Sequence, residues 1–151
     1  MSDVESAVLE SLDTETVAAL IRLLPQVSSR AEPLTAARLE RVLDLPSTRI
    51  VVARLDGAVA GMALLCLCTT LTGQFGLVEE VAVDAPARGH HVGVELMVRL
   101  LELADELGLD FVELTSRPSR EAANGLYQSL GFEQRETNVY RHRLGSTPPR
   151  R

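Results

Sequence analysis

The sequence contains no tryptophan and no lysine, and only 3% of its residues are aromatic. A core built without large rings must be packed mainly by Leu, Val and Ala, and the hydrophobic content of 46% can supply it. No stretch approaches the roughly 18 consecutive apolar residues of a transmembrane helix, so no membrane span is expected. The net charge of -6 argues against non-specific binding to nucleic acid or to an anionic membrane.

Several site signatures are also missing. The absence of lysine excludes the Walker phosphate-binding motif, and no Gly-x-Gly-x-x-Gly run marks a dinucleotide-binding fold. Cys66 and Cys68 alternate with leucines on one strand face, about 7 Å apart, which favours two buried thiols over a disulfide or a metal site. The acidic N-terminal run MSDVESAVLE lacks the pattern of a secretory signal, so we expect a cytoplasmic location.

A chain of 151 residues is about one domain long. We expect a single domain over residues 1–144 and a disordered tail over 145–151, which has no apolar residue to pack. Asp56-Gly57 is the strongest hairpin signal, and a loop is expected over 71–76. The predicted strands cover 4–12, 48–55, 58–70, 77–83, 109–114 and two pieces of 132–144, and the predicted helices cover 14–27, 34–45, 92–107 and 119–130. This order predicts an α/β (α+β) domain with a mixed central β-sheet and helices on both faces.

The segment from Val81 to Gly93 is the most informative part of the sequence. A β-branched strand stops at Asp84, a loop rich in small residues follows, and a long amphipathic helix begins. A helix entered through such a loop presents free backbone N–H groups and the positive end of its dipole, which together favour phosphate. The plain alternative is a turn that merely links a strand to a helix. A zinc site at His90-His91 is disfavoured, because adjacent rings diverge and no spaced ligand set completes a tetrahedron.

A second informative segment covers residues 121–132. Asn124 and Tyr127 are three residues apart and therefore share one face of the predicted helix, and Gly131 ends that helix before Phe132. The alternative for Tyr127 is a core side chain whose hydroxyl is satisfied elsewhere.

These two segments resemble the acyl-CoA-binding motif and the later motif of the GNAT N-acetyltransferase superfamily, in the family's order. Arg88 and Gly93 match the family pattern Arg/Gln-x-x-Gly-x-Gly/Ala, whereas His91 stands where the family usually has glycine. The resemblance covers about residues 48–144, and Thr115 to Asn124 is similar to a bacterial subgroup of mostly unassigned substrate. It implies the GNAT acyl-CoA N-acyltransferase fold, acetyl-CoA as cosubstrate, and direct transfer of the acetyl group to an amine.

The resemblance also implies roles for individual residues. Tyr127 would protonate the departing thiolate, and a backbone N–H near Val81 to Val83 would stabilise the oxyanion. Glu79 and Glu80 are both candidates for the base. As neighbours in a strand they should leave on opposite faces, and alternation does not choose between them; the alternative is a solvated or salt-bridged pair. The implied cofactor-binding residues are Val81, Ala82, Val83, Arg88, Gly89, His90, His91, Val92, Gly93, Val94, Asn124 and Tyr127, and no metal ligand is expected.

The acceptor is expected to be a primary amine of a small molecule, or of a peptide or protein. By the resemblance, its site would come from residues 22–47, 70–77 and 134–140, with Phe75, Glu79, Arg117 and Asn138 as lining groups. The alternative function is a catalytically weakened CoA-binding sensor or interaction module, for which His91 in place of glycine is the main argument. Dimers are common in the family, and an exposed last strand would allow a homodimer.

Overall fold

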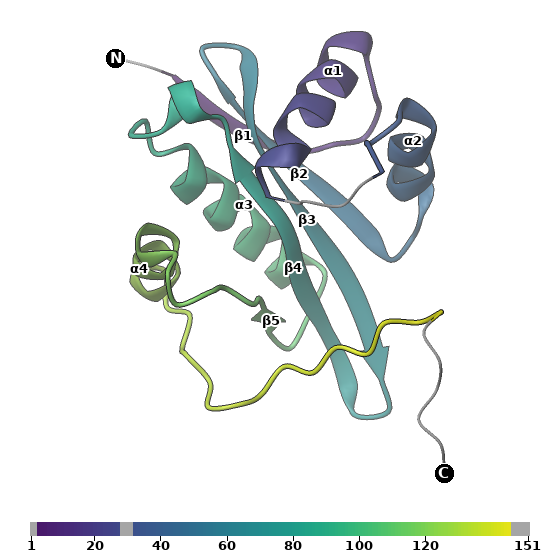
Figure 1. Ribbon diagram of the computed structural model, residues 1–151, viewed down its shortest axis with the longest axis vertical. Helices are drawn as coiled ribbons and strands as arrows, with labels where there is room; N and C mark the ends of the chain where they lie inside the picture. The colour runs from purple at the N-terminus through teal and green to yellow at the C-terminus, as the bar shows by residue number, and fades with distance from the viewer. Residues whose placement is uncertain (1–2, 28–31, 146–151) are drawn as a thin grey trace.

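The computed structural model describes residues 3–27 and 32–145 of the chain (Figure 1). No helix in these ranges is long and apolar enough to cross a membrane. The elements in chain order are β1 (Val4–Val8), α1 (Thr14–Leu23), the 3-10 turn η1 (Leu24–Gln26), α2 (Ala36–Asp44), β2 (Thr48–Leu55), β3 (Ala58–Thr70), β4 (Gly73–Val83), η2 (Ala85–Ala87), α3 (Val92–Glu106), β5 (Val112–Glu113) and α4 (Glu121–Ser129).

The five strands form one sheet in the order β1-β2-β3-β4-β5. The first four strands pair antiparallel, and β5 pairs parallel to β4, so the sheet is mixed as predicted. The predicted hairpin joins β2 to β3, and both turn residues have positive φ, 49° at Asp56 and 87° at Gly57, as a type I′ turn requires.

Helices cover both faces of the sheet, so the predicted architecture is confirmed: α1 and α2 lie on one side, and α3 and α4 on the other (Figure 1). The core is accordingly split into two clusters. The α1–α2 core holds Leu20, Leu23, Leu39, Ile50, Val52, Met62 and Ala82 among its members, and the α3 core holds Val51, Leu65, Val78, Leu96, Met97, Leu100 and Tyr127 among its members.

The helices differ in how firmly they are attached. In α3 six residues are buried, whereas in α2 only Leu39 is. Helix α2 begins later than the pattern predicted, because Thr35 rather than Pro33 defines its start: the Thr35 hydroxyl accepts a hydrogen bond from the Arg38 N–H at 3.2 Å.

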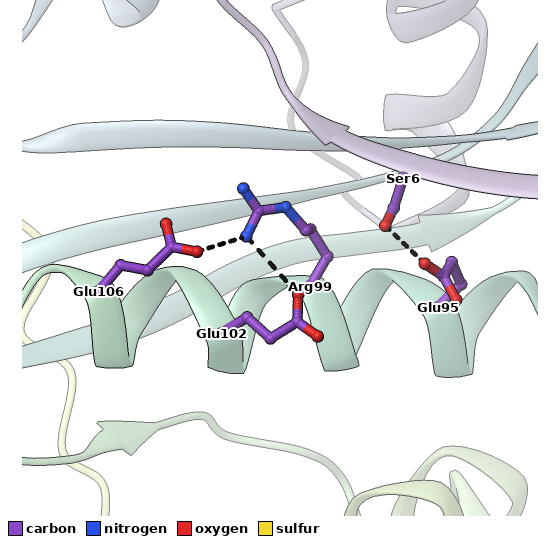
Figure 2. Close-up of polar contacts among 5 residues, drawn as sticks. All are labelled: Ser6, Glu95, Arg99, Glu102 and Glu106. Atoms are coloured by element: carbon purple, nitrogen blue, oxygen red, sulfur yellow. Dashed lines mark hydrogen bonds and ion pairs between the residues drawn. The ribbon is translucent and has the colours of Figure 1, made fainter.

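Polar contacts join α3 to β1 and link three side chains along the helix (Figure 2). The Ser6 hydroxyl of β1 donates to Glu95 Oε1 at 2.8 Å, and Arg99 pairs with Glu102 at 3.7 Å and with Glu106 at 3.4 Å. The arginine pairs are partly exposed and contribute little to stability. The bond from Ser6 joins the first strand to the first turn of α3, so it helps to hold the beginning of that helix against the sheet.

The structure corrects three predicted boundaries. Strand β4 begins at Gly73 rather than at 77, because Thr70 pairs with Gly73 across a tight turn and the expected loop over 71–76 is mostly strand. Strand β1 stops at Val8, and β5 has two residues instead of the predicted six. Beyond Gly145, the expected disordered tail lies outside the described residues.

The two strand pieces expected within 132–144 do not form. This segment has no strand partner, and it leaves Val139, Tyr140 and Leu144 exposed at 72%, 88% and 92%. A strand needs a neighbour to satisfy its backbone, and β5 offers an edge of only two residues. The last strand on which a homodimer was expected is therefore not formed in the described chain.

Gly61 lies on β3 directly under α3. A Cβ atom there would lie 2.8 Å from Leu96 Cδ1, 2.9 Å from Val92 Cγ1 and 3.1 Å from the Ala82 carbonyl oxygen. Gly61→Ala is therefore expected to lower the free energy of unfolding by about 1–3 kcal/mol through overpacking. Urea unfolding monitored by circular dichroism measures the change.

Gly125→Ala is the matched control for this prediction. Gly125 lies within α4, and a Cβ atom there would meet nothing within 4 Å. Because alanine favours the helix, this variant should gain about 0.5–1 kcal/mol. A loss of stability in both variants, or in neither, would contradict the close approach of β3 to α3.

Candidate functional site

The site begins where two parallel strands separate. Strand β4 pairs with β5 only at Gly76 and Leu77, opposite Val112 and Glu113. From Val78 onward the β5-facing edge of β4 has no strand partner in the described chain. The end of this pairing leaves backbone N–H and C=O groups of β4 available to an extended ligand.

A β-bulge interrupts the same stretch of β4. Leu64 of β3 pairs with Glu79, and Met62 pairs with Ala82, so two residues of β4 stand opposite the single residue Ala63. Glu80 occupies the bulge with a φ of 54°, a left-handed conformation that a non-glycine residue adopts only under constraint.

The bulge reverses the faces of β4. Before it, Val78 belongs to the α3 core, and after it, Ala82 belongs to the α1–α2 core, although strict alternation would place both on one face. Glu79 stands opposite Leu64, which packs against the α1–α2 core, and Glu80 lines a cavity on that same side. The expectation that the two glutamates leave on opposite faces is therefore wrong, and both carboxylates are exposed on the α1–α2 side.

That cavity, which we call the α1–α2 cavity, has a volume of about 460 Å³ and lies between helices α1 and α2 and the sheet. Glu80 is among its lining residues and Glu79 is not. Of the expected acceptor region, Leu24 and seven residues between 32 and 42 contribute to the wall. Phe75, Arg117 and Asn138 do not line it, and Phe75 instead stacks on Phe111 with ring centroids 5.1 Å apart. The described lining residues are Leu20, Leu24, Glu32, Pro33, Leu34, Thr35, Arg38, Leu39, Val42, Ile50, Met62, Ala63, Leu64 and Glu80.

The predicted phosphate loop follows the end of β4. Asp84 ties that end to α1, since its carboxylate pairs with Arg22 at 3.1 Å and accepts from Gln26 at 3.4 Å. Gly89 then has a φ of 84°, and a Cβ atom there would point into open space.

The loop ends at His91, which is the N-cap of α3 and has a φ of 63°. Its carbonyl oxygen accepts from the Glu95 N–H at 3.1 Å, while its imidazole makes no capping bond. The backbone N–H groups of Val92, Gly93 and Val94 have no acceptor among the described residues. His91 therefore supplies the backbone conformation for which glycine is usually used, and the helix dipole favours an anion at these donors.

Gly93 brings three parts of the site together. A Cβ atom on Gly93 would lie 3.3 Å from Leu126 Cδ2 and 3.7 Å from Val83 Cγ2. The first turn of α3, the end of β4 and the middle of α4 therefore meet at this residue. The predicted cofactor residues lie on three segments that are thus adjacent: the loop before α3, the free edge of β4, and the part of α4 that carries Tyr127.

Tyr127 is buried, with 8% of its surface exposed, and its ring packs against Phe132 with centroids 5.8 Å apart. Burial raises the pKa of its hydroxyl above the ordinary value, and the charge of Arg120 opposes that rise. The hydroxyl has no hydrogen-bond partner among the described residues. The alternative of a core tyrosine therefore holds for the buried ring, but not for a hydroxyl satisfied elsewhere. Asn124, on the same helix, donates its amide to the Arg117 carbonyl at 3.0 Å, which leaves its side-chain oxygen as the group open to a ligand.

Sequence reasoning missed two features of the site. The bulge at Glu80 has no glycine or proline to mark it, and the only available signal was the pair of adjacent acidic residues inside an apolar strand. Ser116, just beyond β5, has a buried hydroxyl without a hydrogen-bond partner within the described chain. No group of three or more metal-ligating side chains occurs in the described ranges.

The chain is similar to known acetyltransferases in sequence and in fold. Residues 14–132 match the Acetyltransferase (GNAT) family. An IAA acetyltransferase of Azospirillum brasilense is 29% identical over 122 residues, which cover 78% of each chain. An acetyltransferase of Trypanosoma brucei superimposes with a TM-score of 0.74 at 25% identity, covering 93% of this chain and 99% of that one. AAC(6')-Iy, solved with a CoA-linked acetylneamine bisubstrate analogue, superimposes with a TM-score of 0.72 at 18% identity, covering 95% and 99%.

Proposed function

The chain belongs to the acetyltransferase (GNAT) family of acetyl-CoA-dependent N-acetyltransferases, and from this premise we propose that it acetylates a primary amine held in the α1–α2 cavity. The observation that carries the proposal is the bulge of β4. One short stretch of that strand offers an unpaired backbone edge on one side and the Glu80 carboxylate in the cavity on the other. The acyl donor and the acceptor would therefore meet across this stretch.

The residues present fit acetyl-CoA. The backbone of Val81 to Val83 would pair with the extended pantetheine arm, and the free N–H groups of 92–94, together with Arg88, would hold the pyrophosphate. The unpartnered hydroxyl of Ser116 and the side-chain oxygen of Asn124 are further polar groups near the end of β5 and on α4. When bound, acetyl-CoA supplies an activated acetyl thioester.

Two proton movements then complete the reaction. Glu80 accepts a proton from the attacking amine, and Tyr127 Oη gives a proton to the departing sulfur. A backbone N–H of Val81 to Val83 would stabilise the charge that develops on the carbonyl oxygen. The C–N bond forms as the C–S bond breaks, so the products are the N-acetyl amine and the thiol of CoA. Solvent then returns the proton from Glu80 to Tyr127.

The second candidate function is a CoA-binding protein that has lost catalysis. Its main argument is His91, but the left-handed φ of that residue already provides the glycine-like turn. The unpartnered hydroxyl of Tyr127 also favours an enzyme, because a protein that only binds CoA has no use for a proton donor at this place. The test is release of CoA thiol from acetyl-CoA in the presence of amines, with binding followed by the melting midpoint in acetyl-CoA, CoA, ATP and NAD.

His91→Gly is expected to keep the rise in melting midpoint that acetyl-CoA produces. Glycine adopts the φ of 63° without strain, and the imidazole makes no capping bond that the variant would lose. His91→Val is the matched control, because a β-branched residue resists the left-handed conformation and should displace the loop. We expect His91→Val to lose at least half of the acetyl-CoA shift. A lost shift in His91→Gly would instead show that the ring itself holds the cofactor.

A further inference from the structure

Most of the wall of the α1–α2 cavity is apolar: of its fourteen described lining residues, ten are apolar and four are polar or charged. Leu20 and Leu39 come from the two helices, and Ile50, Met62 and Leu64 come from the strands beneath them. These side chains belong to the α1–α2 core or pack against it, so the cavity is continuous with the hydrophobic interior on this face of the sheet. A ligand that enters it must cover apolar surface.

Few polar side chains line the cavity. The hydroxyl of Thr35 accepts the capping bond from the Arg38 N–H, which leaves its own O–H as a single neutral donor. The ionisable side chains that line the cavity are Glu80, Glu32 and Arg38, and all three are exposed. Of these, only Glu80 lies on β4, so it marks the reacting end of the cavity, where the amine must approach the free edge of that strand.

We infer that the acceptor is a primary amine carried on an uncharged apolar body, such as an arylalkyl or branched alkyl amine. The inference rests on the proposed function, because it identifies the occupant of the same acceptor site. The amine would lie at Glu80, and its apolar body would extend between α2 and the strands, over Leu39 and Leu64. The volume of about 460 Å³ is near the lower end of ligand cavities, which run from about 300 to 1,000 Å³, and suits a small molecule of this kind.

The same wall disfavours polar acceptors. Each hydroxyl of an amino sugar placed against Leu20, Ile50 or Met62 would lose its water without gaining a partner, which costs roughly tenfold in affinity or more. A sugar phosphate would have Arg38 as its only cationic partner among the described lining residues. A polyamine would need carboxylates along its length, and the described lining residues include only two, Glu32 and Glu80.

The experiment compares two sets of acceptors with the full-length protein and acetyl-CoA. Phenethylamine and isoamylamine form the apolar set, and glucosamine phosphate, kanamycin and spermidine form the polar set. Release of CoA thiol gives kcat/KM for each acceptor. We expect the better apolar amine to exceed every polar acceptor by about a hundredfold, and a polar acceptor with the highest kcat/KM would overturn the inference.

Two variants test whether the apolar amine binds in the cavity. Leu64→Gln puts a polar group into the wall and should lower kcat/KM for phenethylamine by about tenfold or more. Val42→Thr, which keeps the shape of the side chain, should lower it by a smaller factor and guards against misfolding of the first variant. Leu144→Gln is the matched control, because Leu144 is exposed and does not line the cavity, and it should leave kcat/KM unchanged. Equal values for Leu64→Gln, Val42→Thr and the wild type would overturn the inference.

Binding measurements separate this inference from the proposed function. Absence of a melting shift with acetyl-CoA would overturn the proposed function and the inference with it. A normal acetyl-CoA shift with turnover of polar acceptors alone would overturn only the inference. A phenethylamine-induced rise in the midpoint of the CoA-bound wild type that is absent in Leu64→Gln would support the cavity as the apolar site independently of turnover.

Discussion

Glu80→Gln is expected to lower kcat for acetyl transfer by between about a hundredfold and ten-thousandfold, the usual contribution of a positioned general base. Glutamine keeps the size and the hydrogen-bonding reach of the side chain, but its neutral amide does not accept the proton of the attacking amine. The affinity for acetyl-CoA should be unchanged, because the free edge of β4 is formed by backbone groups. Steady-state release of CoA gives kcat, and isothermal titration with acetyl-CoA gives the affinity.

Glu79→Gln is the matched comparison. It removes the same charge one residue earlier, from a side chain that does not line the α1–α2 cavity. We expect less than about a fivefold loss of kcat from this change. If Glu79→Gln proves the more damaging variant, the base is Glu79 and the bulge serves only to shape the strand.

Tyr127→Phe is expected to lower kcat by about a hundredfold while the protein keeps its fold and its affinity for acetyl-CoA. Phenylalanine preserves the ring that packs against Phe132, and no hydrogen bond to the described chain is lost with the hydroxyl. The loss should therefore fall on kcat, because the acid acts only as the C–S bond breaks. Tyr140→Phe is the control, since the Tyr140 ring is 88% exposed, and it should retain full activity.

The raised pKa of Tyr127 adds a pH signature. Because burial holds this pKa above the ordinary value near 10, the hydroxyl stays protonated throughout the neutral range and the acid form is always present. In the unfolded chain the same group ionises near pH 10, so its contribution to stability is complete below that pH and is lost as the pH rises through the folded-state value. Tyr127→Phe should therefore lose less stability than the wild type above about pH 10 in alkaline unfolding. An identical alkaline loss in both proteins would argue against the raised pKa of Tyr127.

Local signals predicted much of the fold because they depend on backbone geometry that few residues tolerate. Asp56-Gly57 formed the expected turn, and Gly131 has a φ of 90° just past the helix that it was expected to end. At these positions the backbone needs a positive φ, which few residues other than glycine adopt. The residue type therefore indicates the turn or the helix end from the sequence.

Features that depend on partners were not predictable in the same way. The segment 132–144 has the composition of strands, but a strand forms only where a neighbouring strand edge is available. That edge would be β5, and the sequence did not predict that β5 has only two residues. Strand β4 gained residues 73–76 for the opposite reason, since its register opposite β3 continues to the turn at Leu71. Both errors concern pairing rather than propensity.

The predicted site shows the same division. The loop at Gly89 and His91 and the helix that follows were recognisable as a contiguous motif. The different placement of Glu79 and Glu80 relative to the cavity was not, because it depends on a one-residue mismatch between β3 and β4 that no residue type indicates. The cavity wall was also not predictable. In the sequence, Leu20, Leu39 and Ile50 have the pattern of core residues, and only the fold brings them together as a lining.

The unequal attachment of the helices has a consequence for how this protein can diverge. Helix α2 buries one residue, whereas α3, at whose N-terminus we propose the phosphate site, buries six. Local opening of α2 should therefore cost little free energy, and its amides should exchange with solvent well before those of α3. Substitutions in α2 would likewise be tolerated without loosening the half that we propose holds the cofactor. Homologues of this protein are thus expected to change their acceptor specificity during evolution while they keep the same acyl donor.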